Sequence, residues 1–417
     1  SYDDIFEQLN SVQSGLGTKQ SLANPSSILE YGKGDNKNKN ENTNFNLQLA
    51  PTLQINKHLK ATQVFSYTLI RNSQRYMRPY KGVPSFIIDG LGTVYSKVAS
   101  FQAKENNIVS NTRVDWENLY NGSHSIKVFG GFRFNRFKYD ATHLYTQHTT
   151  QSDDKNPSLS SGYQGVNGTA DVWKQIQIYV NADYNYQNRY FATVSALAEA
   201  NSRFGKNAGT KMFGTGWAFF PSVQLGWVLT NEKWFRKNKG VNYLRVNAGF
   251  DMSGNDNISN YAARTAYSSV RYNNKAIGSQ LTNIGNDKIK WETTKKFNVG
   301  LEGNFVDNRI SLAFNYYIHS TTNLLTLKTF ENPIAGINNY WTNGGSLRNQ
   351  GFEFTLSGKP VVTKDWKFEL GATVGHYKNK ITSLPEEEMW SGNRKWVRGG
   401  SLYDLYVVEW AGVNPEN

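Results

Sequence analysis

The chain has 417 residues, of which 38% are hydrophobic, 14% are aromatic and none is cysteine. The lack of cysteine excludes a disulfide scaffold, a thiolate zinc site and a cysteine nucleophile. The formal net charge of +13 is compatible with binding to nucleic acid or to anionic lipid. It is equally compatible with loops that are merely basic. No apolar run reaches 18 residues, which argues against a transmembrane helix. Membrane-spanning strands stay possible, because they need only about 9–11 residues with alternate ones facing lipid.

The first segment, 1–43, is polar and ends in GKGDNKNKNENT, so it is predicted to be a loop or irregular. The opening residues, SYDDIFEQLN, lack the basic start and apolar run of a signal peptide. If the protein is exported, we expect this sequence to be a mature chain or an internal piece.

From residue 44 to 417 the dominant pattern is alternation of apolar and polar residues, which predicts β-strands. The clearest stretches are 44–69, 112–134, 176–197, 217–229, 243–252, 297–319, 352–358 and 366–381. About fourteen strands are expected, with no long amphipathic helix. Aromatic residues, which suit pleated surfaces, lie near the ends of many of these runs.

The predicted connections are of two kinds. Short turns such as NKH, NGSHS, QNR, VDNR and VVTKD alternate with long polar segments at 71–92, 140–170, 200–213, 255–288 and 382–400. An outer-membrane barrel has short turns on one side and long loops on the other. A soluble β-sandwich, whose loops vary less regularly, also fits the strand pattern. The pattern alone leaves both architectures open.

Several motifs from residue 186 onward resemble the barrel of a TonB-dependent outer-membrane transporter of the SusC/RagA kind. They are NRYFATVSALAEANSRFG (188–205), FFPSVQLGWVLTNEKWF (219–235), YLRVNAGFDMSGNDNISNY (243–261), IKWETTKKFNVGLEGNFVDNRISLAFNYYIHSTTNLL (289–325), NGGSLRNQGFEFTLSGKPV (343–361) and YDLYVVEWAGVNPEN (403–417). Their number and order make the resemblance specific, and they cover more than half of the chain.

The resemblance implies an all-β fold, a transmembrane antiparallel β-barrel in the outer membrane with short periplasmic turns and long extracellular loops. Residues 44–417 would form part of a large plugged barrel. The family's plug domain, its TonB-contacting segment and its final strands are not recognisable in this sequence, so we expect an incomplete barrel. The implied function is TonB-dependent import of a nutrient, an oligosaccharide or a peptide, without enzymatic chemistry or a cofactor. The alternative is a surface or soluble β-sandwich that binds glycans or acts as an adhesin. A barrel that serves as a sensor or structural porin is a third possibility.

The implied partners are TonB, through the missing N-terminal region, a surface lipoprotein of the SusD type, and outer-membrane lipid with lipopolysaccharide. The dispersed Lys and Arg residues favour lipid phosphates over nucleic acid, which would require a basic face.

Two sets of residues are candidates for ligand contact. The stretch FNVGLEGNFVDNRISLAFNYYIH (297–319) presents one apolar and one polar row, and the resemblance implies lipid against the first. The second row is expected to face the lumen and consists of Asn298, Glu302, Asn304, Asn315, Tyr317 and His319. Aromatic residues of the long loops are weaker candidates for stacking on a sugar ring or a peptide side chain: Tyr340, Trp341, Trp390 and Trp396.

Other chemistry has little support in the sequence. His143 and His148 are five residues apart and fall on opposite faces of an extended segment, so no metal site is expected. The acidic run PEEEMW (385–390) has no DxDxDG calcium loop beside it. Neither a phosphate-binding loop nor a GxSxG or HExxH motif is present, so no catalytic residue is proposed.

Overall fold

The computed structural model describes residues 38–81, 85–88, 92–150, 162–235, 240–272, 276–334, 336–410 and 412. Most of the predicted irregular segment 1–43 lies outside these ranges, and the first described strand begins at Lys39. The helical structure assigned within them is the short 3₁₀ turn η2 (Leu229–Asn231). No helix in the described ranges is long and apolar enough to cross a membrane.

The described secondary structure is otherwise made of β-strands. Their bounds are β1 (Lys39–Leu49), β2 (Thr52–Gln54), β3 (Leu59–Arg78), β4 (Phe86–Ile88), β5 (Gly92–Val94), β6 (Ser96–Tyr120), β7 (His124–His148), β8 (Gly162–Tyr186), β9 (Tyr190–Asn201), β10 (Thr210–Met212), β11 (Thr215–Val228), β12 (Val241–Asn255), β13 (Ala266–Tyr272), β14 (Ala276–Asn283), β15 (Glu292–Phe305), β16 (Ile310–Thr322), β17 (Leu325–Ile334), β18 (Ile337–Asn343), β19 (Ser346–Val362), β20 (Lys367–Ser383), β21 (Glu388–Ser391) and β22 (Arg394–Val397).

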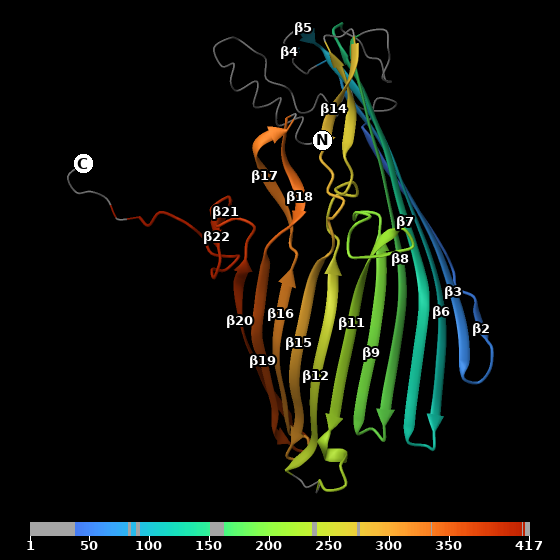
Figure 1. Ribbon diagram of the computed structural model, residues 1–417, viewed down its shortest axis with the longest axis vertical. Helices are drawn as coiled ribbons and strands as arrows, with labels where there is room; N and C mark the ends of the chain where they lie inside the picture. Colours follow the sequence, from blue (N-terminus) through green and yellow to red (C-terminus); the bar gives the residue numbers. More distant parts are fainter. Residues whose placement is uncertain are drawn as a thin grey trace. The chain divides into compact units, whose positions relative to one another are not determined.

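The main sheet has 14 strands in the hydrogen-bonded order β1-β3-β6-β7-β8-β9-β11-β12-β15-β16-β19-β20, with β2 and β10 paired to β3 and β11. The chain forms two compact units. One contains the residues up to Leu49, Phe65–Val109 and Asn135–Val172. The other contains Ala50–Val64, Ser110–Phe134 and Trp173–Asn417, and it carries the candidate site described below. Within this second unit, consecutive long strands are antiparallel neighbours (Figure 1).

The predicted short turns connect strands of the second unit. At NGSHS, Asn121 and Gly122 adopt φ of 49° and 63°, the left-handed conformation that a tight hairpin needs. The VDNR turn between β15 and β16 has three such residues in succession, Val306, Asp307 and Asn308. These turns lie at the same end of the unit in Figure 1. The sequence therefore predicted both the positions and the shortness of these connections correctly.

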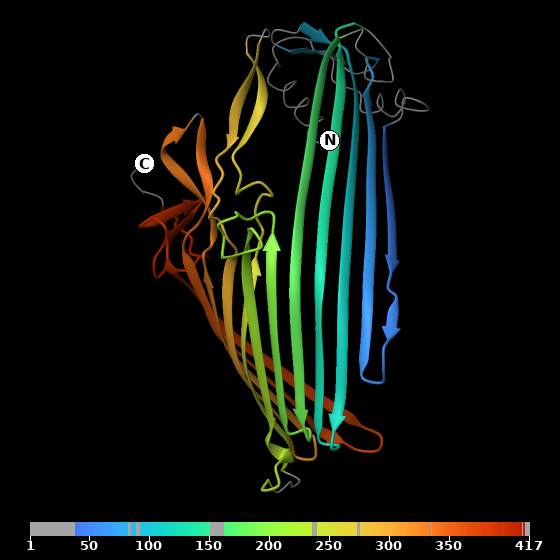
Figure 2. The ribbon, with the colours of Figure 1, turned by 45° about the vertical axis from the view of Figure 1, so that its right-hand side comes forward.

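The long polar segments at the other ends of these strands are more regular than expected. The segment 255–288 contains the hairpin β13–β14, and 382–400 contains β21–β22. A third hairpin, β17–β18, follows β16 (Figure 2). Alternation is hidden in these stretches because both faces of the hairpins carry polar residues, which the period-two pattern cannot detect.

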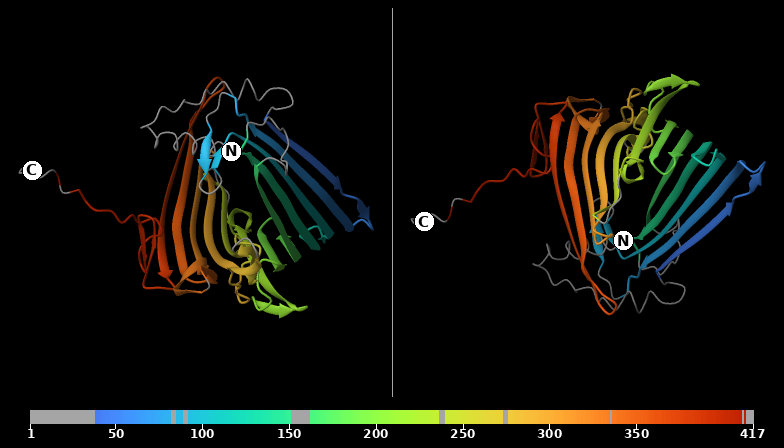
Figure 3. Two further views of the ribbon diagram at one scale, coloured as in Figure 1. Left: turned by 90° about the horizontal axis from the view of Figure 1, so that it is seen from above. Right: turned by 90° about the horizontal axis from the view of Figure 1, so that it is seen from below.

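The register gives the sheet one apolar and one polar face. Cross-strand partners share a face, and one row across four strands reads Leu301, Phe314, Phe354 and Val374. The residues between them in sequence occupy the opposite face. Strands β15, β16, β19 and β20, which carry this row, lie side by side in both views of Figure 3.

The apolar face is exposed, contrary to the behaviour of a soluble protein core. Phe297 is 45% exposed, Phe314 39% and Val374 57%. A contiguous apolar surface over so many strands is unstable in water, and no second sheet covers it within the described ranges. The exposed apolar face argues against the alternative of a β-sandwich, because a sandwich buries such a face against a second sheet.

Buried apolar residues of the second unit cluster at the end of the strands opposite to the short turns. The cluster comprises Phe204, Ala208, Phe220, Ile258, Ala262, Ile289 and Trp291. The Trp291 ring packs 4.2 Å from that of Phe204, and its indole nitrogen donates a 2.9 Å hydrogen bond to Glu199. A Cβ on Gly205 would overlap the backbone of Asp287, so only glycine permits this close approach. The cluster fixes the loops between β9 and β15 onto the strand ends.

A polar anchor holds the turn between β11 and β12. The carboxylate of Glu232 accepts hydrogen bonds from Tyr190 Oη at 2.6 Å, Trp227 Nε1 at 2.9 Å and Arg189 Nη1 at 3.1 Å. These hydrogen bonds, led by that from the Tyr190 hydroxyl, lower the pKa of Glu232 below its ordinary value. Since Tyr190 and Trp227 belong to the apolar face, the anchor joins this turn to that face.

Candidate functional site

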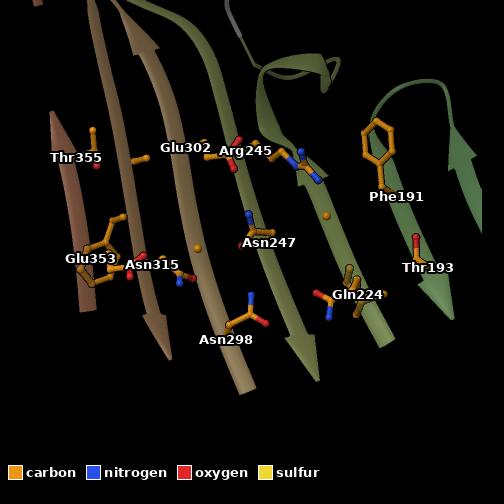
Figure 4. Close-up of a pocket in the computed structure, with 15 residues that line it drawn as sticks. Phe191, Thr193, Gln224, Arg245, Asn247, Asn298, Glu302, Asn315, Glu353 and Thr355 are labelled. Atoms are coloured by element: carbon orange, nitrogen blue, oxygen red, sulfur yellow. The ribbon is translucent and has the colours of Figure 1, made fainter. Parts of the chain in front are cut away.

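A trough of about 350 Å³ lies across the polar face of the sheet in the second unit. Strands β9, β11, β12, β15, β16 and β19 contribute its walls (Figure 4). Its lining consists of Phe191, Thr193, Gln224, Gly226, Arg245, Asn247, Asn298, Gly300, Glu302, Ala313, Asn315, Glu353 and Thr355, together with Leu225 and Phe314, which belong to the apolar rows of the same strands. Its volume is at the lower end of the range for sites that hold small ligands.

The trough exists because glycine alternates with long polar residues along the rows that cross the strands. One row reads Gly226, Asn247, Gly300 and Asn315 on β11, β12, β15 and β16. A Cβ at Gly300 would overlap the side-chain amide of Asn247, so this amide lies over the glycine. Each glycine therefore lets a neighbouring side chain lie flat against the sheet.

The next row of the polar face, two residues along each strand, repeats the arrangement. There Gly249 lies between Gln224 and Asn298, and a Cβ on it would overlap both amide oxygens. Side-chain amides both donate and accept hydrogen bonds. Side-chain amides therefore line the floor of the trough. They can form hydrogen bonds with hydroxyl groups or with peptide groups equally well.

Three charged side chains line the trough. Arg245 and Glu302 are direct cross-strand partners on β12 and β15, and Glu353 lies opposite Asn315 on β19. The Arg245 guanidinium lies over Gly226 and 5.6 Å from the centre of the Phe191 ring. It therefore extends toward β11 and β9, away from Glu302 (Figure 4).

The rest of this face carries further polar groups. Lys296 and Asp251 form an ion pair of 3.3 Å beyond the trough. A second hollow of about 460 Å³ lies beside that pair and is lined by Phe129, Tyr179 and Arg133 among others. Within the described ranges no group of three or more His, Asp or Glu side chains is arranged to hold a metal ion.

The six residues predicted to face a lumen share the polar face, since each alternates with the apolar row. Asn298, Glu302 and Asn315 line the trough. Asn304 pairs with Ser311 nearer the VDNR turn. Tyr317 and His319 do not line the trough; they lie on β16 farther from that turn, with ring centres 4.9 Å apart. The structure brings these residues onto one surface, and their contact with a lumen stays a prediction.

The aromatic candidates of the loops lie outside the trough, on two separate hairpins. Trp341 packs against the buried cluster near Trp291, and its neighbour Tyr340 is half-buried on the same strand, β18. Trp396 is half-buried on β22 and donates its indole N–H to the carbonyl of Leu402 at 3.0 Å.

Trp390 is the most accessible of the four, with 52% of its surface exposed. It packs edge-on against Tyr406 and lies 5.3 Å from Lys395 Nζ. Ligand contact by any of these four residues stays a prediction.

Most residues that line the trough were not among those predicted from the sequence. Arg245, Asn247 and Gln224 alternate with apolar neighbours in YLRVNAGF and PSVQLGW, and Glu353 does so in FEFTL. That alternation could have marked them as residues of the polar face. Which of them meet across strands depends on the register, which sequence alone does not give.

Comparison with known proteins agrees with this architecture. A family model described as "TonB dependent receptor-like, beta-barrel" matches residues 4–402. TonB-dependent receptor P3 of Formosa agariphila is 25% identical over 312 residues, which cover 73% of this chain and 30% of that protein. TonB-dependent receptor SusC of Bacteroides thetaiotaomicron is 28% identical over 218 residues, or 50% of this chain and 21% of that protein.

Among solved structures, one described as the RagAB peptide transporter has a TM-score of 0.71 at 19% identity. It covers 87% of this chain and 39% of the solved chain, and at this identity it supports the fold alone. The chain spans about 30% of the length of the first curated relatives it matches.

Three findings agree with one another: the antiparallel sheet has one exposed apolar face, the short turns lie at one end, and the family model matches residues 4–402. Proteins of this kind lie in the outer membrane, where the apolar face meets lipid. The chain belongs to the TonB dependent receptor-like β-barrel family.

Proposed function

We propose that the complete protein imports a nutrient, an oligosaccharide or a peptide, across the outer membrane with energy supplied through TonB. The observation that carries this proposal is the polar trough, which lies on the sheet face opposite the exposed apolar face. In a closed barrel of this orientation the trough would form part of the lumen wall.

The proposed role of this chain is to hold ligand by hydrogen bonds and charge without a covalent step. Asn298, Glu302 and Asn315, and with them Asn304, Tyr317 and His319, would face the lumen. Tyr340, Trp341, Trp390 and Trp396 would lie nearer the surface, at the hairpins opposite the short turns. Of these, Trp390 is the best placed to stack on an arriving ligand, because it is half exposed.

The proposed partners follow from the family and the relatives. TonB would be the partner that supplies the energy, as the family implies. The similarity to SusC and to the RagAB transporter supports a surface lipoprotein of the SusD type as a second partner. Lipid and lipopolysaccharide would contact the apolar face and the basic loops.

The test is uptake by cells that express the full-length protein, with and without a functional TonB. We expect growth or accumulation on oligosaccharide or peptide mixtures to require both the protein and TonB. Equal uptake in the two strains would contradict energy-dependent import and would favour a passive porin.

A further inference from the structure

A groove of about 700 Å³ lies on the sheet of the second unit, at the end where the VDNR turn connects β15 and β16. Its walls are formed by that turn and by β16, β19 and β20, which are neighbours in the sheet (Figure 1). The lining includes Ile310, Leu356, Leu370 and Ala372, which all belong to the apolar rows. The groove therefore opens on the apolar face and is separate from the trough.

The groove marks the place of a missing side chain. Gly358 on β19 is the cross-strand partner of Ile310 on β16 and of Leu370 on β20, so this apolar row has a gap at its centre. The nearest atom to a Cβ built on Gly358 is the backbone oxygen of Arg309 at 3.9 Å, and no side chain lies within 4 Å. On the polar face, by contrast, a neighbouring amide covers Gly300. The space over Gly358 is thus left to whatever contacts this face from outside.

Both walls of the gap belong to this chain. Strands β16 and β20 are the hydrogen-bonded neighbours of β19 on its two sides. A further strand of a complete barrel that paired with β20 would lie two strand steps, roughly 10 Å, from Gly358. Such a strand leaves the gap between Ile310 and Leu370 open.

Two cations mark one end of the groove. Arg309 ends the VDNR turn, Lys359 follows Gly358 on β19, and both line the groove. The backbone N–H of Lys359 donates a 2.7 Å hydrogen bond to the carbonyl of Arg309, so the two residues are adjacent. Among the described residues of the lining they are the only charged ones, and Asp307 of the same turn is not part of it. The groove is therefore apolar along most of its length and cationic toward the turn.

The position along β16 places these cations at the membrane surface. Phe314 lies near the middle of the apolar row, and Ile310 is four residues, roughly 13 Å, closer to the turn. A strand crosses the hydrocarbon layer with about 9–11 residues, so Arg309, five residues from Phe314, reaches the boundary. The short turns of such barrels lie on the periplasmic side. The groove thus faces the periplasmic leaflet, which is built of glycerophospholipids.

A glycerophospholipid matches both parts of the groove. An acyl chain over Gly358 would supply the packing contacts that the missing side chain does not make. Phosphate is the group that Arg and Lys side chains bind by charge-assisted hydrogen bonds. Since the lining contains two cations and no carboxylate, a head group with a net negative charge fits better than a zwitterionic one.

We propose that this groove is a binding site for one anionic glycerophospholipid of the periplasmic leaflet, with an acyl chain over Gly358 and the phosphate between Arg309 and Lys359. The inference rests on the outer-membrane location of the family and is independent of the import proposal. It distinguishes one specific lipid from the lipids that merely surround the apolar face.

The experiment uses the full-length protein, purified and delipidated in detergent, and native mass spectrometry to measure bound lipid. Phosphatidylglycerol and phosphatidylethanolamine with identical acyl chains are titrated separately, so that only the head group differs. Glycerophosphate tests the head group without acyl chains, and lipopolysaccharide tests the other source of lipid phosphates. We expect one phosphatidylglycerol to bind about tenfold or more tightly than phosphatidylethanolamine, because two cations attract its charge.

The charge variants test the head-group end. Arg309→Gln and Lys359→Gln are each expected to weaken phosphatidylglycerol binding roughly fivefold and to leave phosphatidylethanolamine binding unchanged. Lys364→Gln is the matched control, because Lys364 is an exposed lysine in the turn between β19 and β20 that does not line the groove. We expect it to bind phosphatidylglycerol like the wild type.

Gly358→Leu tests the acyl-chain end. The backbone of Gly358 is not in the left-handed region, so leucine fits the strand and fills the gap in the apolar row. We expect this variant to fold and to lose the tightly bound phosphatidylglycerol. Ala248→Leu is the control for added bulk, because Ala248 lies on the apolar face of β12, outside the groove. Heat-modifiable gel migration verifies that each variant is folded.

Equal binding of the two phospholipids by the wild type would overturn the inference. So would glycerophosphate or lipopolysaccharide binding as tightly as phosphatidylglycerol, or a loss in Lys364→Gln equal to that in Arg309→Gln. Undiminished binding by folded Gly358→Leu would show that lipid does not occupy the gap and would overturn it as well. If Gly358→Leu does not fold, the two charge variants decide.

Discussion

The side-chain amide of Asn247 lies directly over Gly300, its cross-strand partner, so a methyl group at that glycine would displace it. The atom that would clash is the end of a flexible side chain, and the strand itself has no need to move. We therefore expect Gly300→Ala to fold normally but to lower ligand retention by the trough severalfold, because the amide floor is rearranged. Retention of oligosaccharide and peptide mixtures by the purified full-length protein measures this effect.

Gly375→Ala is the matched control for that change. Gly375 lies in the same row of the polar face, opposite Glu353, and a Cβ there would make only an ordinary contact of 3.7 Å. We expect it to leave retention unchanged. Equal effects of the two substitutions would mean that the position of the Asn247 amide is unimportant.

The hydrogen bond from Trp291 to Glu199 predicts a stability effect. Both residues are buried, with 3% and 7% of their surfaces exposed. In Trp291→Phe one oxygen of a buried carboxylate loses its donor, which typically costs about 1–3 kcal/mol. Unfolding by denaturant in detergent, followed by tryptophan fluorescence, measures the change.

Trp366→Phe serves as the comparison, since Trp366 is 75% exposed and is expected to change the free energy of unfolding by less than about 0.5 kcal/mol. If Trp291→Phe were as neutral as this exposed substitution, the loop cluster would not depend on the Trp291–Glu199 bond.

The anchor at Glu232 predicts a pH dependence. Its hydrogen bonds lower the pKa of the carboxylate from the ordinary value of 4.5, so the folded protein holds the charged form more strongly than the unfolded chain does. This stabilisation is present above pH 4.5 and is lost as the pH falls through the lowered pKa. The melting temperature of the wild type should therefore exceed that of Glu232→Gln at pH 6–7, and the gap should close in acid.

Glu386→Gln, at an exposed carboxylate after β20, is the control and should show a small gap at every pH. A Glu232→Gln gap that stays constant down to pH 3 would show that the carboxylate's charge contributes nothing to the turn.

The sequence was most informative where one physical rule acts alone. Alternation predicted the strands and the two faces of 297–319, because residues two apart share a face in any strand. Positive-φ residues such as Asn121 and Gly122 marked tight turns. The pattern does not show which aromatic residues at the ends of the runs are buried, because this depends on neighbouring segments. Trp217, at the start of the run 217–229, is 4% exposed and donates its indole N–H to the carbonyl of Met212.

The trough could not be predicted in the same way. Its shape depends on which glycine lies opposite which amide, and this changes with a shift of one residue in register. The position of the Arg245 guanidinium depends on the room above Gly226, on the neighbouring strand β11. Local sequence contains neither relationship. The candidate residues on 297–319 were found because a single hairpin sets their face.

The most direct test of which face meets lipid places a lysine on each face of one strand. Phe314 lies near the middle of the apolar row of β16, and Asn315 follows it on the polar face. In the full-length protein, Phe314→Lys should lower the free energy of unfolding in lipid by ~2–4 kcal/mol and reduce the heat-modifiable folded fraction. Asn315→Lys should insert and fold like the wild type. If Phe314→Lys folds as well as the wild type, or Asn315→Lys is the more damaging change, the assignment of lipid to the apolar face and of the lumen to the polar face is wrong.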